Sequence, residues 1–204
     1  MDKTIYLVDD DVSVITSLKN LLSSEGYQVF AFTSPAEFLN QPEFTTPCCL
    51  IVDLNMPGLD GFDVSARLTE RGYSIPTIFL TGFGTIPITV KAMKAGAFEF
   101  LTKPVMPDDL LTVVRDALVL SEKSDAVAKE KVELTGRYQS LAPREKELMQ
   151  LVMSGLLNKQ VAAEMGISEI TAKGHKRRVM EKMMVRSASE LVRAAEKLNL
   201  LDDE

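Results

Sequence analysis

Five polar residues between positions 9 and 103 carry charged or hydroxyl groups, and each ends or follows a short apolar run. They are Asp9, Asp10, Asp53, Thr81 and Lys103. Carboxylates held together at neutral pH repel one another, so three acids in one site require a cation. Oxygen ligands suit Mg²⁺ or Mn²⁺, and a metal of this kind bridges protein to phosphate. A lysine ammonium and a threonine hydroxyl both suit phosphate oxygens. Together these groups predict a site that stabilises a phosphoryl group on Asp53.

Each of these residues has a simpler interpretation when it is taken alone. The adjacent acids Asp9 and Asp10 could cap a following helix. Asp53 could be a turn residue, because Pro57 and Gly58 follow it closely. The joint placement of all five residues after four separate apolar runs favours the phosphoryl site.

The pattern of apolar residues indicates the elements that must position this site. Short apolar runs predict strands at residues 4–9, 27–32, 48–53, 76–81 and 98–101. Amphipathic segments predict helices at residues 12–25, 34–40, 61–71 and 86–95, with a fifth starting near residue 108. Strands that alternate with helices form a parallel sheet covered on both faces. We therefore expect a doubly wound α/β domain over residues 1–120, with the polar residues at the carboxyl edge of its five-stranded sheet.

Composition and charge limit the remaining possibilities. No run of about 18 apolar residues is present, and acids interrupt the first ten residues, so we expect neither a membrane span nor a secretory signal. A cytoplasmic location follows as an expectation. The net charge of −6 hides an asymmetry. Residues 1–120 contain eight Lys and Arg against fifteen Asp and Glu, or −7, whereas residues 137–204 contain twelve against ten, or +2.

Residues 121–139 are predicted to form a helical linker. The segment from about residue 108 to 135 lacks glycine and proline and is rich in Ala, Glu and Lys, which favours helix. We expect the fifth helix to continue as a semi-rigid connector to around Glu133 and to end at Gly136. The alternative is a flexible hydrophilic linker.

Residues 140–204 have the pattern of an all-α helix-turn-helix domain. Gly155 and Gly166 separate short helical segments, and Ser168 is a suitable N-cap for the third helix. That helix carries a basic cluster, which comprises Lys173, His175, Lys176, Arg177 and Arg178. Lysine and arginine on a helix after a tight turn suit the major groove of DNA. The simpler alternative is a solvated charged face.

The motifs "LVDDD", "LIVDLNMPGLDG", "FLTG" and "FLTKP" resemble, in their order and spacing, the receiver domain of bacterial two-component response regulators, which has a flavodoxin-like fold. The resemblance implies that Asp53 accepts a phosphoryl group from a sensor histidine kinase. It implies a Mg²⁺ site (or a Mn²⁺ site), whose ligands would be Asp9, Asp10, Asp53 and the backbone carbonyl of Asn55.

Four further positions of the receiver motifs acquire roles from the same resemblance. Lys103 would pair with the aspartate or its phosphoryl group, and the bond to Pro104 would be cis. Thr81 would move to bond the phosphoryl oxygen, and Phe100 would change rotamer with it. Gly82, where many relatives carry Ala or Ser, would leave open access beside the site.

The pattern "LAPREKELMQLVMSGLLNKQVAAEMGISEITAKGHKRRVMEKM" is similar to the LuxR-type helix-turn-helix, and with the receiver it marks the NarL/FixJ family. The resemblance makes the third helix of this domain the recognition helix. The residues expected to face bases are Lys173, Gly174 and Arg177. The residues expected nearer the phosphate backbone are Lys159, Thr171, His175 and Lys176. The fourth helix would supply a dimer contact through Leu191 and Ala194.

The combined prediction is a response regulator that is phosphorylated on Asp53, forms a homodimer and binds inverted half-sites in promoter DNA to activate transcription. RNA polymerase is considered as a further partner, and no membrane partner is expected. The protein is not expected to be an enzyme beyond dephosphorylating itself. One alternative is a phosphate-independent receiver with constitutive DNA binding. Another is a Mg²⁺-dependent phosphohydrolase, which would need a second acid where the chain has Asn55.

Overall fold

The computed structural model describes residues 3–82 and 86–200, with residues 86–89 described by their backbone alone. The chain divides into two compact units, Met1–Asp125 and Ala126–Glu204. Each unit has its own hydrophobic core. None of the helices in the described ranges is long and apolar enough to cross a bilayer.

The first unit is built on a parallel sheet with strand order β2-β1-β3-β4-β5. Its strands are β1 (Thr4–Val8), β2 (Gln28–Phe32), β3 (Cys48–Asp53), β4 (Thr77–Thr81) and β5 (Glu99–Thr102). Every residue of β1, β3 and β4 is buried, because these apolar runs are covered on both faces. The strand order reverses between β1 and β3, and the carboxyl ends of these two strands are therefore the expected place for a site.

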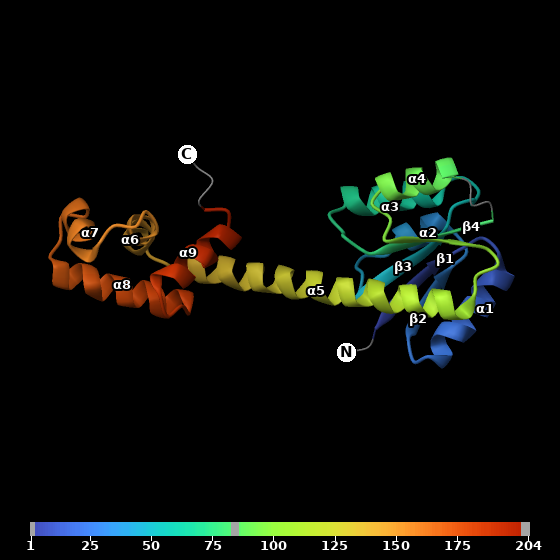
Figure 1. Cartoon of the computed structure of the whole chain (residues 1–204), viewed down its shortest axis with the longest axis horizontal. Coiled ribbons are helices and arrows are strands. Elements are labelled where there is room, and N and C mark those ends of the chain that lie inside the picture. Colours follow the sequence, from blue (N-terminus) through green and yellow to red (C-terminus); the bar gives the residue numbers. More distant parts are fainter. Residues whose placement is uncertain (1–2, 83–85, 201–204) are drawn as a thin grey trace. The chain divides into compact units, whose positions relative to one another are not determined.

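Helices cover both faces of this sheet (Figure 1). They are α1 (Val12–Ser24), α2 (Pro35–Leu39), α3 (Gly61–Glu70), α4 (Ile86–Lys94) and the long α5 (Pro107–Gln139). Helices α1 and α5 form one core with the sheet, whereas α2, α3 and α4 cover the other face. The doubly wound α/β fold is confirmed, and the strand limits agree with the sequence pattern to within one residue.

Helix α3 begins in direct contact with the strand that carries Asp53. Asp60 caps this helix by accepting the Asp63 N–H at 2.8 Å, and the Asp63 carboxylate accepts the Asp60 N–H at 3.0 Å. A Cβ on Gly61 would lie 2.6 Å from the carbonyl oxygen of Asp53. Only glycine fits there, so this residue permits the close approach of helix and strand.

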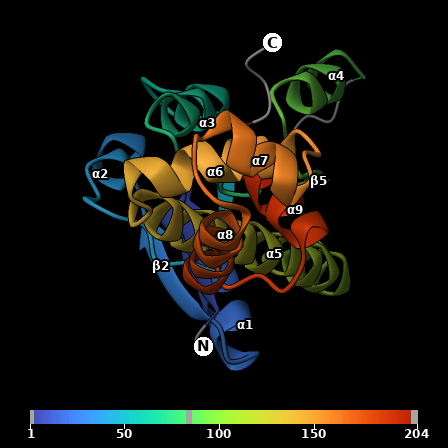
Figure 2. The same cartoon turned by 90° about the vertical axis from the view of Figure 1, so that its left-hand side faces the viewer.

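The described part of the second unit consists of the end of α5 and four shorter helices, which are labelled in Figure 2. These are α6 (Pro143–Met153), α7 (Asn158–Glu164), α8 (Glu169–Met183) and α9 (Ala188–Lys197). Helix α6 contacts the other three, and α7 contacts α8 after a turn in which Gly166 has a φ of 65°. Ser168 caps α8 as expected, since its side chain accepts the Thr171 N–H at 3.1 Å.

The expectation that α5 ends at Gly136 is wrong, because the helix continues to Gln139. Leu134 is 5% exposed within the core of the second unit, and Tyr138 packs against the same core. These contacts hold the helix through the glycine, whose cost in a helix is about 1 kcal/mol. The last turns of α5 are therefore part of the second unit's fold.

A buried acid links two helices of the second unit. Glu145 in α6 accepts a bond from the Lys182 Nζ at 2.6 Å and from the Ala142 N–H at 2.8 Å. The second bond caps α6 at a position where the Ala142 side chain makes no capping bond. The bond to Lys182 holds the pKa of Glu145 below its usual range. This ion pair fixes the far end of α8 to the start of α6.

Candidate functional site

The carboxyl edge of the sheet brings three charged side chains into contact. Asp9 follows β1 and Asp53 ends the neighbouring β3, and both are buried. Between them lies the Lys103 Nζ, 2.6 Å from the Asp9 Oδ2 and 2.7 Å from the Asp53 Oδ1. The Lys103 N–H donates to the Thr81 carbonyl at 2.7 Å, which ties the lysine to the end of β4. Four strand ends thus position this group of residues.

Asp10 completes an acidic cluster at the same edge. The side-chain ligand atoms of Asp9, Asp10 and Asp53 all lie within 4.8 Å of one another. Mg²⁺ binds oxygen at about 2.1 Å, so opposite ligands of one ion are about 4.2 Å apart. Three carboxylates exceed the single positive charge of Lys103, and the donors are all hard oxygens. The residues therefore fit a divalent cation of the Mg²⁺ type with small side-chain movements.

Backbone amides hold the two buried carboxylates in place. The Asn55 N–H donates to the Asp53 Oδ2 at 2.8 Å, and the Asp11 N–H donates to the Asp9 Oδ1 at 2.9 Å. The next acid, Asp11, has the separate role of N-cap, because its side chain accepts the Ser13 N–H at 2.8 Å. Helix capping, which was the simpler interpretation of Asp9 and Asp10, is therefore the role of Asp11.

The close contacts change the protonation behaviour of the site. Burial raises the pKa of Asp9, although its bonds to Lys103 and to the Asp11 N–H oppose this effect. Burial by itself would lower the pKa of Lys103, but its bonds to Asp53 and Asp9 outweigh this and raise it. The ammonium group therefore keeps its proton at neutral pH and remains a fixed positive charge beside Asp53.

The remaining receiver positions lie on β4 and β5 or just after these strands. Thr81 is fully buried at the end of β4, and Phe100 in β5 is half-buried against the core. The Lys103–Pro104 bond is cis, as the resemblance implied. A Cβ on Gly82 would meet none of the described atoms within 4 Å, apart from those of its chain neighbours. The switch role of Thr81 and Phe100 stays a prediction.

Helix α8 presents the base-facing candidates on one exposed stripe. Arg177 follows Gly174 by three residues and Lys173 by four, which is the spacing of neighbours on one helix face. The side chains of Lys173 and Arg177 are 59% and 83% exposed. A Cβ on Gly174 would meet no atom within 4 Å, so its exposed backbone has room around it.

The four candidates for phosphate contact differ in exposure. Lys159 and Thr171 are exposed, whereas His175 and Lys176 are half-buried. The Nδ1 of His175 is out of reach of solvent and has no hydrogen-bond partner among the described residues. The Lys176 Nζ donates to the Asn158 Oδ1 at 3.4 Å, which places this lysine between α8 and α7. A role in DNA contact stays a prediction for all four.

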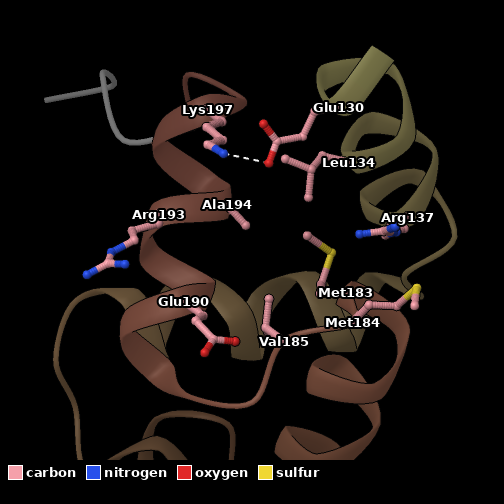
Figure 3. Close-up of a pocket in the computed structure, with 10 residues that line it drawn as sticks. All are labelled: Glu130, Leu134, Arg137, Met183, Met184, Val185, Glu190, Arg193, Ala194 and Lys197. Carbon is pink, nitrogen blue, oxygen red and sulfur yellow. Dashed lines mark hydrogen bonds and ion pairs between the residues drawn. The ribbon is translucent and has the colours of Figure 1, made fainter. Parts of the chain in front are cut away.

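The expected dimer contacts of α9 need correction. Leu191 is 0% exposed and Ala194 is 5% exposed, and both belong to the core of their own unit. Figure 3 shows Ala194 turned toward Leu134 of α5, where it lines a pocket of about 240 Å³. Lys197 of α9 pairs with Glu130 of α5 at 2.5 Å beside the same pocket. Glu130 and Leu134 of α5 therefore line the same pocket as Ala194, and Leu191 is buried in the core of the same unit.

Two acids on α8 were missed by the reasoning from sequence. The Glu169 Oε1 pairs with the Lys173 Nζ at 2.9 Å, and the Glu181 Oε1 pairs with the Arg177 Nε at 2.8 Å. Both pairs have the i, i+4 spacing at which helix side chains meet, and this spacing could have revealed them. The two cations expected to face bases are therefore partly neutralised in the free protein.

Comparison with known proteins places both units in one family. The family model of the response regulator receiver domain matches residues 5–115, and that of bacterial regulatory proteins of the luxR family matches residues 139–195. The chain belongs to the NarL/FixJ family of response regulators. The alternatives of a constitutive receiver and a phosphohydrolase are not favoured.

Relatives of this response regulator match it over nearly its whole length. The response regulator protein TmoT of Ectopseudomonas mendocina is 44% identical over 197 residues, covering 97% of this chain and 90% of that protein. The transcriptional regulatory protein FixJ of Bradyrhizobium diazoefficiens is 38% identical over 202 residues, covering 98% and 97%. The solved structure of the response regulator StyR is 40% identical, with a TM-score of 0.86 over 97% of this chain and 100% of that chain.

Family membership gives the two units their general roles. A receiver domain implies a histidine kinase partner, and a LuxR-type helix-turn-helix implies DNA binding. The response regulator thus has the two parts of a two-component transcription regulator. Receiver domains generally bind Mg²⁺ at an acidic pocket, which here corresponds to the cluster of Asp9, Asp10 and Asp53.

Proposed function

We propose that Asp53 is the phosphoacceptor of this response regulator. A carboxylate oxygen of Asp53 attacks the phosphorus of a phosphohistidine on the kinase, the N–P bond breaks, and the imidazole nitrogen keeps the electron pair. The observation that carries the proposal is the position of the Lys103 Nζ, which bonds Asp53 and Asp9 at once. From this position the ammonium group can pair with a phosphoryl oxygen once Asp53 is phosphorylated.

Asp9, Asp10, Asp53 and the carbonyl of Asn55 would hold the Mg²⁺. When bound, the metal supplies positive charge that offsets the carboxylates and the incoming phosphoryl group. The chain's own contribution is to hold the acceptor still, since the Asn55 N–H fixes the Asp53 Oδ2 at 2.8 Å. The other oxygen of Asp53, which now pairs with Lys103, is the one that can turn toward the phosphorus.

Phosphorylation would change the positions of side chains on β4 and β5. We assign to the Thr81 hydroxyl the bond to a phosphoryl oxygen, and to Phe100 the rotamer change that follows. Because Phe100 is only half-buried, a second position for its ring requires little repacking. The altered surface would favour a homodimer, and two recognition helices held together would bind inverted half-sites.

In this scheme α8 enters the major groove of promoter DNA, with Lys173, Gly174 and Arg177 facing bases. The pairs with Glu169 and Glu181 would open as the cations reach DNA. The regulator would act in the cytoplasm as an activator, with RNA polymerase as a further partner. Its enzymatic activity would be limited to dephosphorylating itself.

The decisive test is phosphorylation by a small donor. The full-length protein and Asp53→Asn are incubated with Mg²⁺ and acetyl phosphate, and both are analysed by intact-mass spectrometry and size-exclusion chromatography. We expect the wild type alone to gain one phosphoryl group and to shift toward a dimer. Equal phosphorylation of Asp53→Asn would contradict the assignment of the acceptor. Phosphoramidate is tested as a second small donor, so that rejection of acetyl phosphate alone is not taken for the lack of a phosphoacceptor.

A further inference from the structure

Helix α8 presents one large apolar side chain to solvent near its start. Ile170, the second residue of the helix, is 84% exposed. The residues that α8 contributes to the core are Ala172, Val179 and Met183, all of which lie on another face. An isoleucine this exposed gains almost nothing from burial in the free protein. Its side chain therefore adds almost no hydrophobic stabilisation to the folded unit.

Ile170 lies on the same stripe as the residues expected to face bases. Lys173, Gly174 and Arg177 follow it by three, four and seven residues, the spacing of one helix face. At Gly174 the missing side chain leaves the backbone bare, and a Cβ added there would meet no atom within 4 Å. A helix without a side chain at this point can approach the floor of a groove closely.

The neighbours of Ile170 are held in place by other contacts. The Glu169 side chain pairs with Lys173 at 2.9 Å, and the Thr171 hydroxyl lies 2.8 Å from the Ser168 Oγ. Both therefore have partners within the protein at the start of the helix. Glu169 and Thr171 are polar and Ala172 is buried, so Ile170 is the exposed apolar side chain of the first turn.

We propose that Ile170 determines DNA specificity by contacting the C5-methyl group of a thymine in each half-site. N-terminal residues of a recognition helix contact base edges, and the thymine methyl is the apolar group that the major groove displays. The surrounding cations bind phosphates or guanine and cannot make this contact. The inference rests on the proposed DNA binding. It specifies in addition that one position of each half-site must be thymine.

The test removes the methyl group from the DNA and the side chain from the protein. Full-length protein treated with acetyl phosphate first selects its half-site from a randomised DNA pool. Each thymine of one selected half-site is then replaced by deoxyuridine, which lacks only the methyl group. For one thymine we expect a loss of affinity of roughly fourfold, the factor for about one buried methyl group.

The same replacements are measured with Ile170→Ala. We expect this variant to bind the thymine site more weakly and to lose the difference between thymine and deoxyuridine at that one position. Val132→Ala is the control, because Val132 is 73% exposed on α5 and should retain the full difference. Thermal unfolding of both variants establishes that the second unit is intact.

The outcomes separate the two proposals. If no deoxyuridine position changes affinity, or if Ile170→Ala keeps the wild-type difference, the thymine contact is wrong while DNA binding stands. If the phosphorylated wild type selects no sequence at all, the proposed function fails together with the contact.

Discussion

Leu134 provides a direct measure of how far α5 belongs to the DNA-binding unit. Its side chain is 5% exposed and packs in the core formed by α6, α8 and α9. Replacing a buried leucine by alanine removes apolar contacts and leaves a cavity, at a typical cost of 2–5 kcal/mol, and about 3 kcal/mol is a reasonable value here. For a domain of 60–100 residues this corresponds to a fall in Tm of about 10–25 °C.

The assay is thermal and urea unfolding of the full-length protein, followed by far-UV circular dichroism and by limited proteolysis of each unit. We expect Leu134→Ala to lower the transition of the second unit and to leave that of the receiver nearly unchanged. Val132→Ala is the matched control, since Val132 lies on the same helix and is 73% exposed. Its effect should stay within about 0.5 kcal/mol.

Two results would refute this reasoning. If Leu134→Ala and Val132→Ala unfold at the same temperature, the end of α5 is not part of the core. If the receiver transition falls instead, the assignment of Leu134 to the second unit is wrong.

Three further predictions follow from the described contacts. Gly61→Ala should destabilise the receiver by about 2 kcal/mol or more through overpacking, because its Cβ would lie 2.6 Å from a carbonyl oxygen. Gly82→Ala should be tolerated, because its Cβ would meet none of the described atoms within 4 Å, apart from those of its chain neighbours, and urea denaturation compares the two variants. The bond from Lys182 lowers the pKa of Glu145. The ion pair therefore stabilises the fold above the usual pKa of 4.5, and this stabilisation is lost as the pH falls below that value. In Glu145→Gln the free energy of unfolding should depend less on pH in this acid range. Burial raises the pKa of Cys48 to about 12, so its thiol should react with Ellman's reagent only after denaturation, and rapid labelling of the native protein would contradict this.

The sequence was sufficient for the fold of the receiver and for the residues gathered at its edge. Apolar runs and glycines located the strands, and parallel strands necessarily place Asp9 and Asp53 at the same edge. Whether the Lys103 ammonium lies between them depends on a loop after β5, and no periodic pattern determines the course of a loop. The residue pattern placed Lys103 at this edge, and the family resemblance added its pairing with Asp53.

The second unit was predicted less completely, because helix faces were assigned without knowing their neighbours. Leu191 and Ala194 form an apolar stripe that suits either a core or a dimer contact. The sequence does not show that Leu134 arrives from α5 to cover part of that stripe. For the same reason, Gly136 was interpreted as a helix end, although packing on both sides of it maintains the helix.

One helix contributes buried residues to both cores, and this restricts how regulators of this type can be recombined. Leu110, Val114 and Leu118 of α5 belong to the receiver core, whereas Leu134 belongs to the other. All residues from 126 to 133 are exposed, and Glu130 already pairs with α9. A crossover between two such genes would preserve both cores if it fell at codons 126–129. A hybrid joined at the nominal start of the helix-turn-helix, near residue 140, would combine the core of one parent with the α5 residues of the other.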